Sequence, residues 1–156
     1  MQDFVVNHRA IFYYNQEMKD YFSRFKFQGD YVLASAFSKD IKKILKNYER
    51  FTIVPVPVSE SRLLERGFNQ VTSMLDVLGI EYIELFERFE SQSQSQKSRE
   101  ERINRKQIFK LKDNIKIPSK ILIIDDIYTT GSTIHLMYQL VKDKVGLEFC
   151  SLSVAR

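Results

Sequence analysis

The chain has 156 residues, 44% of them hydrophobic, which is enough for one domain with a buried core. No apolar run approaches the roughly 20 residues that a membrane span needs, and the segment before Arg9 lacks the apolar stretch of a signal peptide. The single cysteine, Cys150, excludes an internal disulfide and a cysteine-rich zinc site within this sequence. We therefore expect one cytoplasmic domain over residues 1–156, and its net charge of +4 suits an anionic ligand.

Strands and helices are predicted to alternate along the chain, which favours an α/β fold with a mainly parallel sheet flanked by helices. Ligands of such sheets bind at the C-terminal ends of the strands. Val58, the Phe86 region and Asp125 are therefore expected along one edge. The predicted elements are a strand at 9–14, a helix that Asn15 caps, a helix at 30–46, a strand at 51–58, a helix at 69–78, a strand at 82–86, a charged helix at 98–106, a strand at 121–124, a helix at 132–144 and a strand at 147–154.

Residues 121–133 carry the most informative pattern: an apolar run, then Asp125 and Asp126, then a loop of hydroxyl residues that enters a helix. A helix N-terminus offers unpaired N–H groups and the positive end of its dipole to an anion. Gly131 lets the backbone approach a phosphate closely. The carboxylates suit the hydroxyls of a vicinal diol, and a diol beside a phosphate describes a ribose 5-phosphate. An ordinary strand–turn–helix with a polar turn is the alternative.

Other phosphate motifs do not fit this stretch. A Walker A loop would need a lysine after Gly131, and the dinucleotide fingerprint G-x-G-x-x-G is absent. The stretch instead resembles the type I phosphoribosyltransferases, whose site for phosphoribosyl pyrophosphate (PRPP) is a strand, two acidic residues and a Thr/Gly/Ser loop. Residues 124–133 match that pattern without a gap, which implies that Asp125 and Asp126 hold the ribose as catalytic residues. The resemblance assigns the 5-phosphate to Ile127, Tyr128, Thr129, Thr130, Gly131, Ser132 and Thr133.

A second stretch, residues 54–70, is similar to the ComF family, the competence-associated branch of these proteins. It combines Val-Pro-Val-Pro with Arg-Gly-Phe-Asn-Gln at 66–70. Residues 25–30 and 94–109 are also similar to that family. Arginine matches phosphate oxygens well, but Arg66 could pair with a local glutamate instead. The resemblance implies that Val58, Ser59, Arg62 and Arg66 bind pyrophosphate, and that Gln94, Lys97 and Arg102 belong to a flexible loop at about 88–107 that closes over the site.

Members of this family usually begin with a zinc module of paired CxxC motifs, which this sequence lacks. The resemblance implies that Mg²⁺ arrives with PRPP, with no direct protein ligand, and that the protein takes part in DNA uptake with other competence proteins.

Three functions stay open: phosphoribosyl transfer to an unknown acceptor, non-catalytic PRPP sensing, and binding of single-stranded DNA. Residues 88–112 hold eight Lys or Arg against three Glu, which suits a nucleic-acid backbone or a solvated helix face. The oligomeric state is not predicted.

Overall fold

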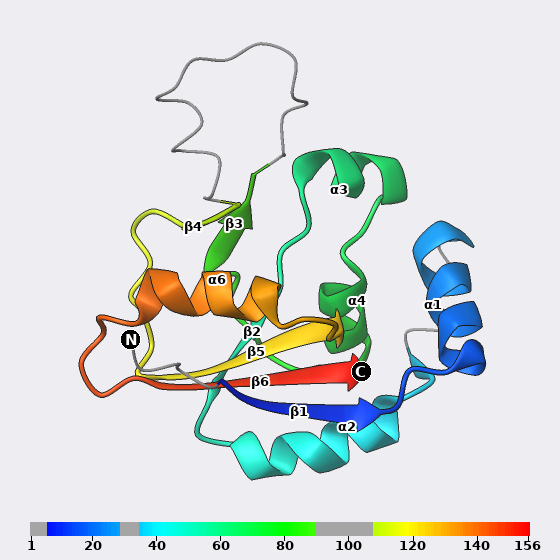
Figure 1. Ribbon diagram of the computed structural model, residues 1–156, viewed down its shortest axis with the longest axis horizontal. Helices are drawn as coiled ribbons and strands as arrows, with labels where there is room; N and C mark the ends of the chain where they lie inside the picture. Colours follow the sequence, from blue (N-terminus) through cyan, green and yellow to red (C-terminus); the bar gives the residue numbers. More distant parts are fainter. Residues whose placement is uncertain (1–5, 29–34, 90–107) are drawn as a thin grey trace.

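A computed structural model describes residues 6–28, 35–89 and 108–156, and shows four strands in the order β1-β6-β5-β2. Every neighbouring pair of these strands is parallel, which confirms the predicted α/β class. Helices lie on both faces of this sheet (Figure 1). The strand bounds are β1 Asn7–Phe12, β2 Thr52–Pro55, β5 Lys120–Ile127 and β6 Glu148–Ala155.

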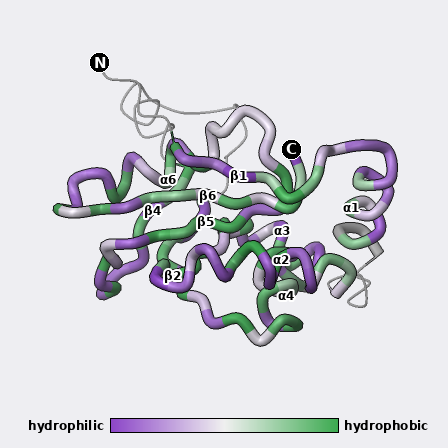
Figure 2. The backbone as a smooth tube through the Cα atoms, turned by 90° about the horizontal axis from the view of Figure 1, so that it is seen from below, coloured by the Kyte–Doolittle hydropathy of each residue, from purple (hydrophilic) through white to green (hydrophobic). Residues whose placement is uncertain are grey.

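Alternation along β5 divides the core into two apolar layers, because successive side chains point to opposite faces of a sheet. Leu122 and Ile124 pack with α1, α2 and α4, whereas Ile121 and Ile123 pack with α6. Figure 2 shows the hydrophobic character of the central strands. No described helix is both long and apolar enough to cross a bilayer. The helix bounds are α1 Gln16–Gln28, α2 Ser38–Leu45 with the 3-10 turn η2 Lys46–Tyr48, α3 Glu60–Arg66, α4 Gln70–Val77 and α6 Ser132–Val141.

The strand predicted at 82–86 is misplaced. The chain runs beside β2 there, where the Ile83 N–H donates to the Ile53 carbonyl at 3.0 Å. It then forms β3 (Phe86–Arg88), which pairs antiparallel with β4 (Phe109–Leu111) in a separate two-stranded sheet. The Phe86 region is therefore not a strand end of the main sheet, although β3 still brings Arg88 within electrostatic range of Asp125.

Other boundaries also differ from the prediction. Helix α2 begins at Ser38 because residues 35–37 form a turn in which the Phe37 ring packs on the rings of Phe12 and Tyr21. Strand β5 continues beyond Ile124, because pairing with β6 extends through the two aspartates. Helix α6 ends at Val141, before a turn, and α3 and β4 were not predicted. The charged helix expected at 98–106 lies outside the described residues.

Candidate functional site

The two aspartates lie near the C-terminal end of β5 in different environments. Asp126 is buried, with 7% of its surface exposed, and its Oδ2 accepts a hydrogen bond from Gln70 Nε2 at 2.8 Å. Asp125 is only half-buried, and its Oδ1 accepts from the Asp126 backbone N–H at 2.8 Å. Asp125 is thus the more accessible carboxylate, while Asp126 is fixed by the neighbouring helix. Their contact with a ribose stays a prediction.

The Arg-Gly-Phe-Asn-Gln element fastens α4 to this edge of the sheet. Asn69 caps α4 by accepting from the backbone N–H of Val71 at 2.9 Å, and its Nδ2 donates to the Val56 carbonyl at 3.1 Å. Phe68 is buried against Phe25 of α1, with ring centroids 5.4 Å apart. Gln70 then reaches Asp126. The motif therefore holds both the loop after β2 and one of the two acidic side chains.

The loop predicted to hold the 5-phosphate leads directly into α6. Gly131 is the N-cap of that helix at φ +78°, and no side chain among the described residues caps it in the usual way. Thr130 donates its hydroxyl to Ser132 Oγ at 3.0 Å, and both side chains are exposed. A helix start presented in this way offers N–H groups and hydroxyls to an anion.

A glycine is required at position 131 for two separate reasons. Its positive φ is costly for other L-residues. In addition, a Cβ at this position would overlap the hydroxyl and ring of Tyr128, which lies under the loop. The Tyr128 N–H donates to the Ala155 carbonyl at 2.9 Å, so this residue continues the ladder between β5 and β6. Tyr128 therefore supports the loop and was not anticipated in that role from the sequence.

The Tyr128 ring rests on His8 of β1, with stacked ring centroids 3.7 Å apart. His8 is held by two buried serines of β6: Nδ1 lies 2.8 Å from Ser151 Oγ and Nε2 lies 3.2 Å from Ser153 Oγ. Burial, followed by the positive charge of Arg156, lowers the pKa of His8 to about 4. The ring under Tyr128 is therefore neutral at physiological pH.

The loop after β2 lies beside the aspartates. The Val56 N–H donates to the Ile124 carbonyl at 2.9 Å, so the pairing of β2 with β5 continues past Pro55. Val58 is half-buried there, and Ser59 is buried and is the N-cap residue of α3. Helix α3 carries the exposed Arg62, with the half-buried Arg66 in its last turn. Their roles in pyrophosphate binding stay predictions.

Arg88 is a further cation at this site and was not predicted from the sequence to take part in it. Burial and the nearby charge of Arg62 lower its pKa, while Asp125 acts in the opposite direction. Its guanidinium carbon lies 5.6 Å from the centroid of the Phe109 ring. Arg88 thus lies within electrostatic range of both the predicted pyrophosphate arginine and the predicted ribose carboxylate, although β3 is not part of the main sheet.

Part of the predicted site lies outside the described residues, namely Gln94, Lys97 and Arg102 of the expected flexible loop. Two further cations of the basic segment are described, and both form ion pairs: Lys110 with Glu87 at 3.1 Å and Lys112 with Glu84 at 3.2 Å. The described residues contain no group of three or more His, Cys, Asp or Glu side chains that could hold a metal ion.

Comparison with known proteins shows the family to which this chain is related. The chain is 43% identical over 151 residues to the competence protein ComFC of Streptococcus pneumoniae (strain ATCC BAA-255 / R6), which covers 97% of this chain and 69% of that protein. This chain belongs to the ComFC family. A second member, the competence protein ComFC of Bacillus subtilis (strain 168), is 35% identical over 139 residues, covering 87% of this chain and 58% of that protein. The chain matches no protein-family model.

The ComFC relatives are longer than this chain, which spans 69% of the first and 58% of the second. Among solved structures, the chain is similar to a crystal structure of a hypoxanthine phosphoribosyltransferase from Staphylococcus aureus. That likeness has a TM-score of 0.42 at 19% identity, and it covers 78% of this chain and 61% of the other.

Proposed function

We propose that this ComFC-family domain binds PRPP with Mg²⁺ at the C-terminal edge of its parallel sheet, and that this binding serves competence. The observation that carries the proposal is the junction of β5 with α6. The half-buried Asp125 is followed by the loop 128–131, which exposes Thr129 and Thr130 and leads into the N-terminus of a ten-residue helix. A carboxylate for hydroxyls and a helix start for a phosphate fit the two ends of a ribose 5-phosphate.

The charges around this junction suit the pyrophosphate group of the same ligand. Arg62 and Arg88 influence each other electrostatically, and Asp125 lies within range of Arg88. Bringing cations together is unfavourable by itself, and an anion between them would relieve that repulsion. Arginine forks also match phosphate oxygens in pairs. The same cations would stabilise the charge on a leaving pyrophosphate, as transfer from C1 of the ribose requires.

Mg²⁺ fits this arrangement as an ion that accompanies the phosphates. It prefers carboxylate and phosphate oxygens and keeps several waters. Asp125 offers one accessible carboxylate, whereas Asp126 is already engaged by Gln70. The protein would therefore supply few direct ligands, and the ion would neutralise phosphate charge during binding.

A binding titration separates the two aspartates. Asp125→Asn should weaken PRPP binding by about 10- to 100-fold, through the loss of a charged hydrogen-bond acceptor, and should leave the melting temperature nearly unchanged because the side chain is accessible. Isothermal titration calorimetry with Mg²⁺ present measures the affinity. The matched control is Glu84→Gln, which removes a surface carboxylate paired with Lys112 and should not affect binding. Equal affinities for wild type and Asp125→Asn would refute the site.

The same proteins separate an enzyme from a sensor and from a DNA-binding protein. An enzyme releases pyrophosphate when an acceptor is supplied, whereas a sensor binds PRPP without releasing it. A protein that acts through single-stranded DNA would instead show binding that falls steeply with salt and ignores Asp125→Asn. In competent cells, Asp125→Asn should lower transformation by added DNA. Normal transformation in that strain would show that competence does not require PRPP binding at this site.

A further inference from the structure

A polar cavity lies at the edge of the main sheet opposite to the predicted PRPP site. It is formed where β2 and β5 begin and where the chain approaches β6, so it lies at the strand starts, whereas the loop 128–131 follows a strand end (Figure 1). Its volume is about 540 Å³, within the range of roughly 300–1,000 Å³ that is typical of small-molecule sites. The residues that line it are Arg50, Thr52, Lys116, Ile117, Pro118, Ser119, Lys120 and Lys144.

The charged residues that line this cavity are all positive. Four of its lining residues are cationic, and no described acidic residue lines it. Lys120 is partly neutralised, because its Nζ lies 2.6 Å from the carboxylate of Glu148. Among the described residues, no ion pair joins Arg50, Lys116 or Lys144 to a carboxylate. Like charges gathered on one concave surface raise the local potential and attract anions.

The cations come from three separate segments of the chain, with Lys116 and Lys120 on one of them. Arg50 follows η2, Lys116 precedes β5, Lys120 opens β5, and Lys144 lies in the turn after α6. The core strands fix the ends of these segments: the Glu148 N–H donates to the Ser119 carbonyl at 2.7 Å. The charges are therefore brought to one place by tertiary structure, and their convergence is not a property of one basic stretch of sequence.

We propose that this cavity binds a small anion that carries two or more phosphate groups. Several cations around one cavity exceed what a single carboxylate would need, and the Thr52 and Ser119 hydroxyls can donate to phosphate oxygens. The convergence of the cations on a cavity favours a compact ligand over an extended nucleic-acid strand. This site is independent of the PRPP proposal, because none of its residues belongs to the other edge.

Nuclear magnetic resonance with inorganic tripolyphosphate tests this site directly. In the ¹⁵N-labelled protein, tripolyphosphate should shift the backbone amides of Thr52, Ser119 and Lys144. Lys116→Gln/Lys144→Gln should weaken that response at least tenfold. Any response at Thr130 and Gly131 reports the other edge and is scored separately, so the two proposals can fail independently.

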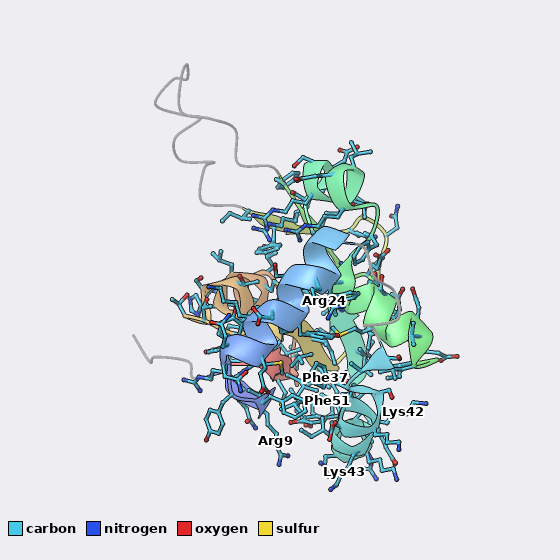
Figure 3. All side chains as sticks on the ribbon, turned by 90° about the vertical axis from the view of Figure 1, so that its right-hand side faces the viewer. Arg9, Arg24, Phe37, Lys42, Lys43 and Phe51 are labelled. Atoms are coloured by element: carbon cyan, nitrogen blue, oxygen red, sulfur yellow. The ribbon has the colours of Figure 1, made fainter. Side chains whose placement is uncertain are left out.

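A matched control uses lysines outside the cavity. Lys42 and Lys43 are exposed on α2 and project from its surface (Figure 3). Lys42→Gln/Lys43→Gln makes the same change in net charge and should leave the tripolyphosphate response intact. The proposal is overturned if the two double variants respond alike, or if tripolyphosphate does not shift the cavity amides. It is also overturned if a short oligothymidylate shifts these amides while tripolyphosphate does not, which would indicate a nucleic-acid surface.

Discussion

The loops that follow β2 and β5 are adjacent in space but are stabilised in different ways. The loop after β2 is held from the side, because Asn69 of the α4 cap donates to its Val56 carbonyl and Ser59 is buried at the start of α3. The loop after β5 is supported from below by the Tyr128 ring, and its Thr129 and Thr130 side chains are exposed. One loop is therefore anchored by a hydrogen bond from the cap of a neighbouring helix, and the other is supported by an aromatic ring under a glycine.

This difference explains how one edge can present both a fixed and an open surface. The anchored loop keeps its backbone in place next to Asp126, which Gln70 holds from the same helix. The supported loop leaves the Thr129 and Thr130 side chains exposed and the start of α6 without a side-chain cap. Preorganised donors of this kind need little rearrangement on binding. Substitutions in each support should therefore have separable effects on stability and affinity.

The largest effect is expected at the aromatic support. Gly131→Ala adds a Cβ that overlaps Tyr128 and places alanine at φ +78°. Backbone strain and overpacking together should lower the free energy of unfolding by about 2–4 kcal/mol and displace the loop. Chemical denaturation measures the loss of stability, and PRPP titration should show affinity reduced at least tenfold.

A second glycine provides the control for that substitution. Gly146 has a similar φ of +71°, but a Cβ there would meet no atom within 4 Å. Gly146→Ala should therefore cost only the backbone strain, about 1–2 kcal/mol, and should leave PRPP affinity unchanged. Equal losses in the two variants would show that Tyr128 does not support the loop.

A smaller effect is expected at the hydrogen-bonded anchor. Asn69→Ala removes both the cap of α4 and the bond to Val56, and should cost about 1–2 kcal/mol. Asn69→Asp keeps the capping acceptor but loses the donor to the Val56 carbonyl. The aspartate variant should retain more stability than the alanine variant, yet bind PRPP more weakly than wild type. If Asn69→Asp binds PRPP as wild type does, the anchor does not position the loop.

The smallest effect concerns His8 under the Tyr128 ring. Its pKa is lowered to about 4 in the fold, against about 6.5 for an unperturbed histidine. Between pH 6.5 and pH 4, His8 therefore binds a proton more readily in the unfolded chain than in the folded protein. The neutral His8 contributes to the free energy of unfolding above about pH 6.5, and this contribution is lost as the pH falls toward 4. Discounted for partial exposure, this loss is roughly 1 kcal/mol.

Melting curves between pH 7 and 4 for wild type and His8→Gln measure this contribution. The wild type should lose more stability than the variant over that interval, because glutamine does not titrate. The difference between the two proteins, rather than the absolute slope, isolates His8 from the carboxylates. Parallel curves for the two proteins would show that His8 does not titrate with a lowered pKa.

The sequence allowed the alternation of elements and the open loop to be predicted, because both are local. The apolar run, the two aspartates and the hydroxyl loop are contiguous in 121–133, so spacing alone indicates a strand, a turn and a helix. The strand was nevertheless predicted too short. Its last residues are kept in the sheet by pairing with β6, and local pattern does not report a partner strand.

The supports of the site could not be predicted from local sequence because they join distant segments. Gln70 and Asp126 are 56 residues apart, and His8 reaches Tyr128 from the other end of the chain. Gln70 belongs to a recognisable motif, but that motif does not predict which side chain Gln70 contacts. In the sequence, Arg88 is one of several basic residues, and only the fold of β3 shows that it lies within electrostatic range of Arg62 and Asp125.

The most direct test of the central claim is the melting temperature with Mg²⁺ alone, with PRPP alone and with both, in wild type and Asp125→Asn/Asp126→Asn. Wild type should gain about 5–10 °C with both ligands at 100-fold excess over Kd. The double variant should remain folded without ligand, with a lower melting temperature because Asp126 is buried, and should show no gain. An absent shift in wild type, or the same shift in the double variant, would contradict a PRPP site at Asp125 and Asp126.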